Sequence, residues 1–495
     1  MNDARDQGSP EGRTAGFVPE DLDSMIIALP LLAMFDDGTE RDPYDIVIDL
    51  NLEYPGGKEA ARDQIRELVR DAVASKGQTP DQGIDSGKTA ASGQYIFATL
   101  DEEVIRELVR LDTERAEGLK ARAVFHVWPD FRVKALITNS IRTVKADAAH
   151  VSFSALGRDV VWAVLDSGIA RHPHFEKHEN FALDEALAHR DFTKNDGDPF
   201  VDDFGHGTHV AGIIAGECAD STGKLVGVRR YRNEQNAVVS EPKPLEHISG
   251  MAPQCKLLNL KVLDENGGGL TSNIMAALQY IQELNGYGRR LRVHGVNLSV
   301  GYEFEPEWFA CGQSPLCVEV DHLVRSGVVV VVAAGNTGYG WQKVPNRVVA
   351  AGLDLTINDP GNAERAITVG ATHRDMPHIY GVSYFSSKGP TGDGRPKPDL
   401  IAPGERIMSC AAGRRLAESG VVEPDKAVYV EDSGTSMAAP HVSGVVAGFL
   451  SIRNEFIGRP DRIKEIFTST ATDLRRDRSF QGHGLVDVMR AIQSV

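Results

Sequence analysis

The chain has 495 residues, enough for one large domain and a smaller one, and 41% of them are apolar, which excludes disorder as the default state. Acidic residues number 70 against 53 basic ones, and the resulting charge of −17 would repel nucleic acids and anionic lipids. We therefore expect neither nucleic acid nor membrane among its partners.

Five cysteines, an odd number, are scattered along the chain and match neither a zinc pattern nor a dense disulfide framework. We interpret them as reduced, mostly buried thiols. Cys311 and Cys317 could still pair across a short loop in an oxidising compartment.

Residues 1–43 are predicted to be an N-terminal tail, disordered in part because its first 20 residues are polar. One apolar run, Met25 to Phe35, lies between acidic residues, whereas a signal peptide needs a basic leader and a membrane span needs about 20 residues. The run is expected to be a buried or docking segment. A cytoplasmic location follows, with export by a non-standard route as the alternative.

Residues 44–133 are predicted to form a small α+β domain. Strand patterns at 45–52, 94–100 and 123–128 alternate with helical patterns at 58–74 and 101–111, and a Gly- and Ser-rich connector occupies 76–92. This order suits an open sheet with helices on one face, of the split βαβ kind. An independent binding domain would have the same composition.

Residues 134–495 are predicted to form a larger α/β domain. Apolar runs at 160–165, 257–262, 293–300 and 328–334 alternate with amphipathic helices. Near-continuous apolar strands between helices indicate a parallel sheet covered on both faces, which gives three layers. Catalytic residues in such sheets lie at the carboxyl ends of the strands.

Polar residues follow several of these runs. Asp166 comes directly after one of them, where it could serve chemistry or only cap a turn. His206 lies between two glycines just before a predicted helix, 209–215, and the glycines would let a backbone or a substrate approach its imidazole. Asn336 ends another run, where it could donate to an oxyanion or only form the turn.

The stretch Gly434 to Val442 is a glycine-led turn that presents Ser436 and continues as an apolar helix to about Ile452. A serine hydroxyl is a weak nucleophile until a base takes its proton. The candidate partners of this serine are the carboxylate of Asp166, the imidazole of His206 and the side-chain amide of Asn336.

The chain resembles the subtilisin-like serine proteases, or subtilases. The motifs that carry the resemblance occur in the family's order and span most of residues 140–490: VLDSGI, DDFGHGTHVAG, SGMAPQCKLLNLKVL, GVNLSVG, VVVAAGNTG, PDLIAPG and GTSMAAPHVSG. The order Asp, His, Ser is that of subtilisin itself.

The resemblance implies that Ser436 attacks the scissile carbonyl, that His206 takes its proton, and that Asp166 orients and stabilises the imidazole. The Asn336 amide and the Ser436 N–H would bind the oxyanion. No catalytic metal is implied. The chain is thus expected to be a serine endopeptidase, a hydrolase that cleaves peptide or protein substrates.

Two further segments resemble the strands that hold substrate in this family by backbone hydrogen bonds. They are Ser299, Val300 and Gly301, and Gly267, Gly268 and Gly269; the second could also be a flexible surface turn. Tyr302 stands where relatives often have glycine, which makes the side-chain preference uncertain.

Three insertions depart from the family pattern, at 229–248, 303–318 and 339–358. The first replaces a loop that often holds calcium in relatives, so structural calcium is only a weak expectation. Asp202 and Asp203 lie near His206 and either favour basic substrates or are solvated loop carboxylates.

The resemblance makes the 44–133 domain similar to the subtilase propeptide, an inhibitor of its own enzyme that is later cut. The connector 76–92 is its weakest match, since a strand would be expected there. Autoprocessing is expected between Arg132 and Asn139, which makes the chain a zymogen. Two alternatives remain open: a pseudoprotease that binds peptides, and an uncut cytosolic protease with a permanent regulatory N-terminal domain.

Overall fold

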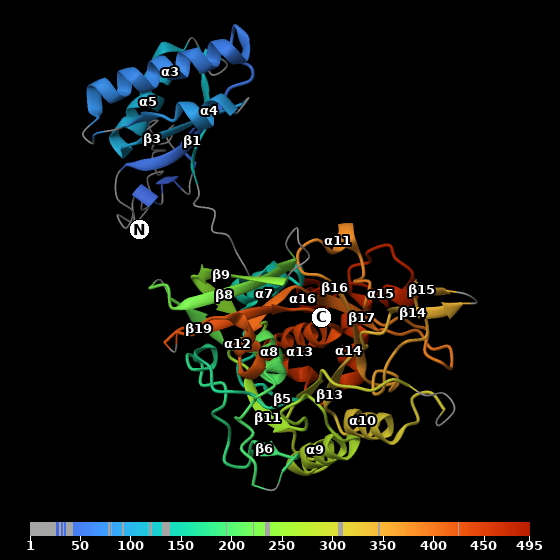
Figure 1. The fold of residues 1–495 in the computed structure, drawn as a ribbon. Helices are drawn as coiled ribbons and strands as arrows, with labels where there is room; N and C mark the ends of the chain where they lie inside the picture. Colours follow the sequence, from blue (N-terminus) through green and yellow to red (C-terminus); the bar gives the residue numbers. More distant parts are fainter. Residues whose placement is uncertain are drawn as a thin grey trace, which may run out of the picture. The chain divides into compact units, whose positions relative to one another are not determined.

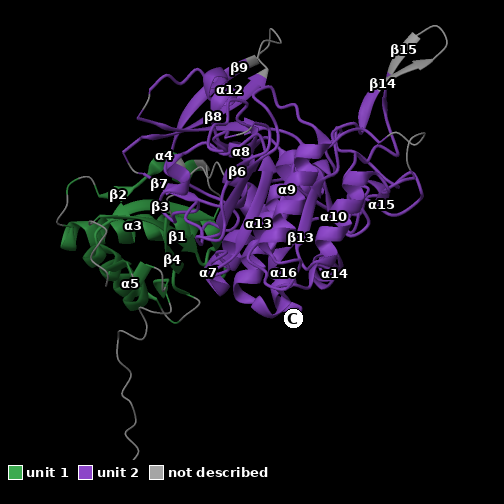
Figure 2. Ribbon diagram, turned by 90° about the horizontal axis from the view of Figure 1, so that it is seen from below, with its two compact units in different colours: residues 1–135 green, residues 136–495 purple. Residues whose placement is uncertain are grey.

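A computed structural model of the chain describes residues 26–495, apart from 29–30, 33, 36–42, 78–79, 81, 92–93, 117, 119–120, 131–138, 195, 221, 233–237, 305–309, 345–346 and 424. It divides into two compact units, residues 1–135 and 136–495, which Figure 2 colours separately. The tail up to residue 25 and nearly all of the expected processing interval lie outside the described residues.

The N-terminal unit is a four-stranded antiparallel sheet with its two long helices on one face (Figure 1). Its elements are β1 (Tyr44–Leu50), α3 (Gly57–Lys76), β2 (Gly83–Ile84), α4 (Ser86–Ala91), β3 (Tyr95–Leu100), α5 (Glu102–Arg115) and β4 (Val124–Pro129). The strand order β2-β3-β1-β4 is that of a ferredoxin-like fold, as predicted.

The sequence pattern missed one strand of this sheet. β2 lies within the predicted connector and pairs with β3 through Gly83 and Ile84. Two residues are too few to show a period of two, so only the pairing with β3 reveals the strand. The described residues of the apolar run before β1 pack into the same core, with Ile26, Ile27 and Leu31 fully covered.

The larger unit is built on a parallel sheet of seven strands, in the order β17-β16-β13-β12-β5-β11-β6. The strands are β5 (Val161–Asp166), β6 (Arg190–Asp191), β11 (Lys256–Lys261), β12 (Gly295–Leu298), β13 (Val329–Ala333), β16 (Ile367–His373) and β17 (Leu400–Glu405). Every neighbouring pair is parallel, so all carboxyl ends lie along one edge. The predicted three-layer α/β fold is confirmed.

Apart from the edge strand β6, the strands bury both of their faces, which explains the apolar runs. Trp162, Val164, Val329 and Val331 face a core that includes α8 (His206–Ile214) and α13 (Thr435–Ile452). Ala163, Leu165, Val330 and Val332 face a second core under α9 (Thr271–Leu284) and α10 (Pro315–Arg325). Figure 1 shows these helices around the sheet.

Shorter elements surround this sheet. Helices are α6 (Asn139–Thr143), α7 (Ala146–Phe153), α11 (Pro377–Tyr380), α12 (Gly413–Ser419), α14 (Pro460–Ser469), α15 (Arg478–Gln481) and α16 (Val488–Gln493), with 3₁₀ turns η2 (Pro173–Phe175) and η3 (Asn454–Phe456). Strands are β7 (Glu217–Ala219) with β10 (His247–Ser249), and the four-stranded sheet of β18 (Ile407–Cys410), β19 (Ala427–Asp432), β8 (Leu225–Arg232) and β9 (Val238–Leu245).

Two of the three predicted insertions contain antiparallel strand pairs. Residues 229–248 hold the end of β8, all of β9 and the start of β10, and residues 339–358 hold β14 (Tyr339–Val344) and β15 (Arg347–Gly352). All five cysteines are free thiols, so Cys311 and Cys317 are not paired.

Helix α13 alone, among the described helices, is long and apolar enough to span a membrane. Within that stretch 83% of the residues are buried inside the protein. Packing against the parallel sheet therefore accounts for its apolar surface.

Candidate active site

Asp166 and His206 form a buried pair at the carboxyl edge of the sheet. Asp166 is the last residue of β5, and its Oδ1 lies 2.7 Å from Nδ1 of His206, the first residue of α8. The two side chains are only 1% and 12% exposed. Because an ionised carboxylate can only accept, Nδ1 carries the proton and Nε2 is left as the acceptor.

Asp202 holds the start of α8 in place. Its carboxylate accepts from the N–H groups of Gly205 at 2.8 Å and Thr208 at 2.9 Å, from the Thr208 hydroxyl at 2.6 Å, and from the Ser167 hydroxyl at 2.8 Å. Asp202 is therefore a buried cap that positions His206, and both predicted readings of this residue were wrong.

The residue after His206, Gly207, has no room for a side chain. A Cβ at this position would lie 2.1 Å from the carbonyl oxygen of Gly168 and 3.0 Å from Cβ of Asp166. The group that approaches Gly207 closely is thus the backbone of Gly168, and not a substrate. The absence of a side chain lets α8 pack against the end of β5 and brings the imidazole to the carboxylate.

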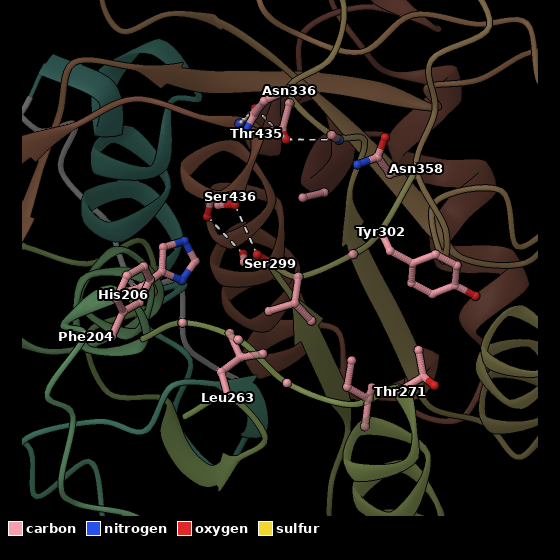
Figure 3. Close-up of a pocket in the computed structure, with 18 of the residues that line it drawn as sticks. Phe204, His206, Leu263, Thr271, Ser299, Tyr302, Asn336, Asn358, Thr435 and Ser436 are labelled. Carbon is pink, nitrogen blue, oxygen red and sulfur yellow. Dashed lines mark hydrogen bonds between the residues drawn. The ribbon is translucent and has the colours of Figure 1, made fainter. Parts of the chain in front are cut away.

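Ser436, the second residue of α13, is joined to Ser299 by two hydrogen bonds. The Ser299 hydroxyl donates to the Ser436 carbonyl over 2.9 Å, and the Ser436 hydroxyl donates to the Ser299 carbonyl over 3.1 Å. The Ser436 carbonyl is available because Pro440, four residues later, has no N–H. Ser436 and His206 lie next to each other in Figure 3, but the described hydrogen bonds include none between them, so their pairing requires a turn of the serine side chain.

Asn336 lies just beyond β13 and is oriented by Thr435. Its Oδ1 accepts from the Thr435 N–H at 2.9 Å and from the Thr435 hydroxyl at 3.1 Å. Because a backbone N–H can only donate, Oδ1 must face Thr435, and Nδ2 is left as a donor beside the cavity that Asn336 lines. Thr435, the residue before Ser436, therefore determines that Nδ2 of the Asn336 amide, and not Oδ1, is free to donate.

A cavity of about 680 Å³ brings the predicted residues together. Its lining includes His206, Asn336, Ser436, Gly267, Gly268, Gly269, Ser299, Val300, Gly301 and Tyr302, with Phe204, Thr337 and Asn358. Asp166 lies behind His206 and does not line the cavity. Both predicted substrate segments thus border the same cleft as the serine (Figure 3).

Most glycines in these segments are required by the protein's own packing. A Cβ on Gly267 would lie 2.5 Å from the Phe204 ring, and one on Gly301 would lie 2.6 Å from the Asp359 carbonyl oxygen. Gly268 has its nearest such neighbour at 3.6 Å. Of these three positions, only Gly268 would accept a Cβ at an ordinary van der Waals distance from its neighbours.

Opposing influences set the pKa of His206. Burial is the largest and lowers it, but the charge of Asp166 and the hydrogen bond to Asp166 outweigh burial and raise the pKa above its ordinary value of 6.5. The cation of Arg415 lowers the pKa and the carboxylate of Asp432 raises it. The imidazole is thus a stronger base than an isolated histidine.

Among the described residues, no group of three or more His, Cys, Asp or Glu side chains is placed to hold a metal ion. The segment expected to replace a calcium loop contributes strands β8 and β9. Calcium binding through other oxygen ligands stays a prediction.

Sequence reasoning missed several residues of the site, among them Thr435, which orients Asn336, and Phe204 and Thr337, which line the cleft. Thr435 stands directly before the serine, and that position was the available signal. Asn358 ends the predicted insertion 339–358, and it lines the cleft although it lies 78 residues before Ser436 in the chain.

Comparison with known proteins finds relatives of this chain among the serine proteases. A family model described as the Subtilase family matches residues 157–484, which include Asp166, His206, Asn336 and Ser436. Serine protease AprX of Bacillus subtilis (strain 168) is 29% identical over 381 residues, 74% of this chain and 74% of that protein. Subtilisin E of the same organism is 28% identical over 428 residues, 86% of each. A solved protease structure from Pseudoalteromonas arctica is 24% identical, with a TM-score of 0.48 over 72% of this chain and 93% of that one.

Proposed function

Because this chain belongs to the subtilase family of serine proteases, we propose that it hydrolyses peptide bonds through an acyl-enzyme formed on Ser436. The observation that carries the proposal is the buried pair of Asp166 and His206, joined at 2.7 Å beside the cleft that Ser436 and Asn336 line. A protein that only binds peptides gains nothing from a serine placed beside an activated base.

In the proposed reaction, the Ser436 hydroxyl turns from Ser299 to Nε2 of His206 and attacks the scissile carbonyl. The proton passes to His206, which Asp166 holds in the required tautomer, and then to the leaving amine. Nδ2 of Asn336 and the Ser436 N–H donate to the oxyanion. Water then repeats the sequence on the acyl-enzyme and releases the second product.

A fluorophosphonate probe tests the proposal, since it reacts only with an activated serine. We expect a single adduct on Ser436 in the wild-type chain and none in Ser436→Ala. Ser494→Ala, at the C-terminus, is a matched control and should label as the wild type does. An unlabelled wild-type chain, even after removal of its N-terminal unit, would favour the peptide-binding pseudoprotease.

We further propose that the chain cuts itself between Arg132 and Asn139 and that its N-terminal unit inhibits the enzyme until then. Supporting this, the unit has the predicted ferredoxin-like fold, and Tyr95, Phe125 and Trp128 on its strands are at least 39% exposed. Contiguous exposed apolar patches mark binding surfaces, and the rings of Phe125 and Trp128 both contact the His126 ring on β4.

Intact-mass measurement over time tests autoprocessing. The wild-type and Ser494→Ala chains should lose the N-terminal unit, whereas Ser436→Ala should keep its full mass, because the cut needs the nucleophile. Peptidase activity should rise together with the cut. A full-length wild-type chain that is already fully active would instead identify a permanent regulatory domain.

The pH profile should reflect the raised pKa of His206. Only the neutral imidazole accepts the serine proton, so kcat/KM should fall as the pH drops through an ionisation above 6.5. Asp432→Asn removes a charge that raises this pKa and should move the acid limb to lower pH. Arg415→Gln removes a charge that lowers it and should move the limb to higher pH. Shifts of both variants in one direction would contradict this assignment.

A further inference from the structure

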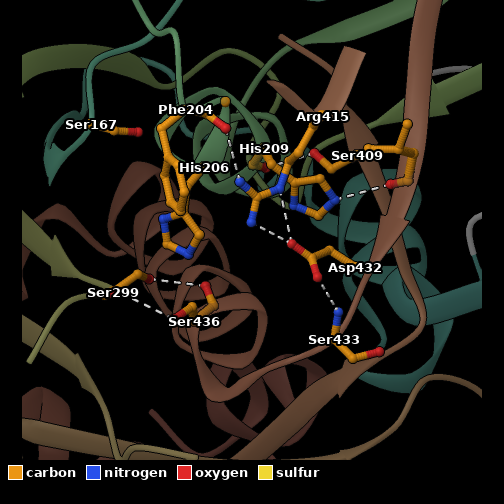
Figure 4. Close-up of polar contacts among 12 residues, drawn as sticks. Ser167, Phe204, His206, His209, Ser299, Ser409, Arg415, Asp432, Ser433 and Ser436 are labelled. Atoms are coloured by element: carbon orange, nitrogen blue, oxygen red, sulfur yellow. Dashed lines mark hydrogen bonds and ion pairs between the residues drawn. The ribbon is translucent and has the colours of Figure 1, made fainter. Parts of the chain in front are cut away.

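A second cavity lies on the other side of Phe204 from the catalytic cleft. Phe204 lines both cavities, and the second, of about 210 Å³, is also lined by Arg230, Arg414, Arg415, Glu418, Val430, Glu431 and Asp432. In Figure 4, Arg415 and Asp432 lie on the opposite side of Ser436 from Ser299. Ser299 begins one of the two proposed substrate segments, so the second cavity lies on the far side of the serine from that segment.

Each acidic side chain of this cavity is already neutralised by an arginine. Asp432 accepts from Nε of Arg415 at 2.9 Å and from its Nη2, and Arg230 Nη2 lies 3.1 Å from Glu418. Glu431 pairs with Arg374 and Arg406. Burial opposes the charge of Asp432, but Arg415 outweighs it and holds the pKa of Asp432 below its usual range. These carboxylates are therefore engaged and do not offer a site for a basic side chain.

Arg414 differs from the other arginines of this cavity in its contacts. Its guanidinium lies 5.5 Å from the centre of the Phe204 ring, and its side chain forms no ion pair with any carboxylate among the described residues. Arg415 stacks on the same ring at 5.3 Å and donates to the Phe204 carbonyl at 3.3 Å, which holds the ring beside His206. The stacking leaves Arg414 exposed but orients it. In a chain of net charge −17, the guanidinium of Arg414 is a local positive site beside Phe204, which also lines the catalytic cleft.

We infer that this cavity is a subsite for an acidic side chain on the leaving-group side of the scissile bond, and that Arg414 binds its carboxylate. The inference rests on the proposed function. A guanidinium without a carboxylate partner can form a charge-assisted pair with Asp or Glu of the substrate. The paired acids around it would repel a further acid only weakly, because each is neutralised.

Quenched peptides test the subsite. Each series would share one sequence before the scissile bond and carry Glu, Gln or Lys at one of the first three positions after it. At one position we expect the Glu peptide to have a kcat/KM about 5- to 10-fold above the Gln peptide, with the Lys peptide lowest. The ratio should fall as ionic strength rises, since the subsite is exposed.

Arg414→Gln should bring the Glu-to-Gln ratio close to one, and Arg414→Lys should retain part of it. Arg462→Gln is the matched control, because Arg462 is also exposed but pairs with Glu465 on α14; it should keep the wild-type ratio. A ratio near one in the wild type at all three positions, or a preference for Lys, would overturn the inference while leaving the protease intact. Failure of every peptide together with failure of fluorophosphonate labelling would overturn the proposed function instead.

Discussion

Ser436→Ala is expected to lower kcat by about 10⁶-fold, the size of loss that removal of the nucleophile causes in subtilisin. The reason is that the acyl-enzyme forms on the Ser436 hydroxyl, which alanine lacks. His206→Ala should cost nearly as much, because without a base the hydroxyl keeps its proton. The double variant should be no slower than either single variant, since the two residues act as one unit.

Single-turnover kinetics on a peptide substrate would measure these losses. Ser451→Ala, at the other end of α13, is a suitable control. The Ser451 hydroxyl donates to the Gly448 carbonyl, accepts from the Gly157 N–H and lies outside the cleft. It should keep the wild-type kcat. Losses that multiply in the double variant would show that Ser436 and His206 act independently and would contradict the mechanism.

Asn336→Leu is expected to lower kcat by about 10²- to 10³-fold with little change in KM. Nδ2 of Asn336 would donate to an oxygen that becomes fully charged only in the transition state, so its loss affects the chemical step more than binding. Thr435→Val should have a smaller effect, because the Thr435 N–H still holds Oδ1 of Asn336.

Separate determination of kcat and KM distinguishes this role from a structural one. Thermal unfolding of both variants should be measured alongside, since a loss of folded protein would lower the apparent kcat without any effect on the oxyanion. A rise in KM at unchanged kcat would show that Asn336 binds substrate in the ground state and would contradict the oxyanion role.

Much of the fold could be predicted from the sequence because its signals are local. The apolar runs that became β5, β11, β12 and β13 have no polar residue facing solvent, which only a sheet covered on both faces allows. The predicted helix near His206 was three residues too short at its start. The glycines on either side of His206 obscured the first turn, which the carboxylate of Asp202 caps.

The sequence by itself determined which chemical groups are available and in what order, since Asp166, His206, Asn336 and Ser436 each follow a local pattern of strand end or helix start. Only the tertiary structure decided how those groups are held. The Asn336 amide is oriented by Thr435, 99 residues away, and Asp202 is a buried cap and not a substrate contact. Arg414, which pairs with no carboxylate in the part of the chain that the structure describes, lies over Phe204, 210 residues earlier in the chain. These relations depend on which segments the sheet brings together, and hydrophobic periodicity within one segment carries no information about a partner so far away.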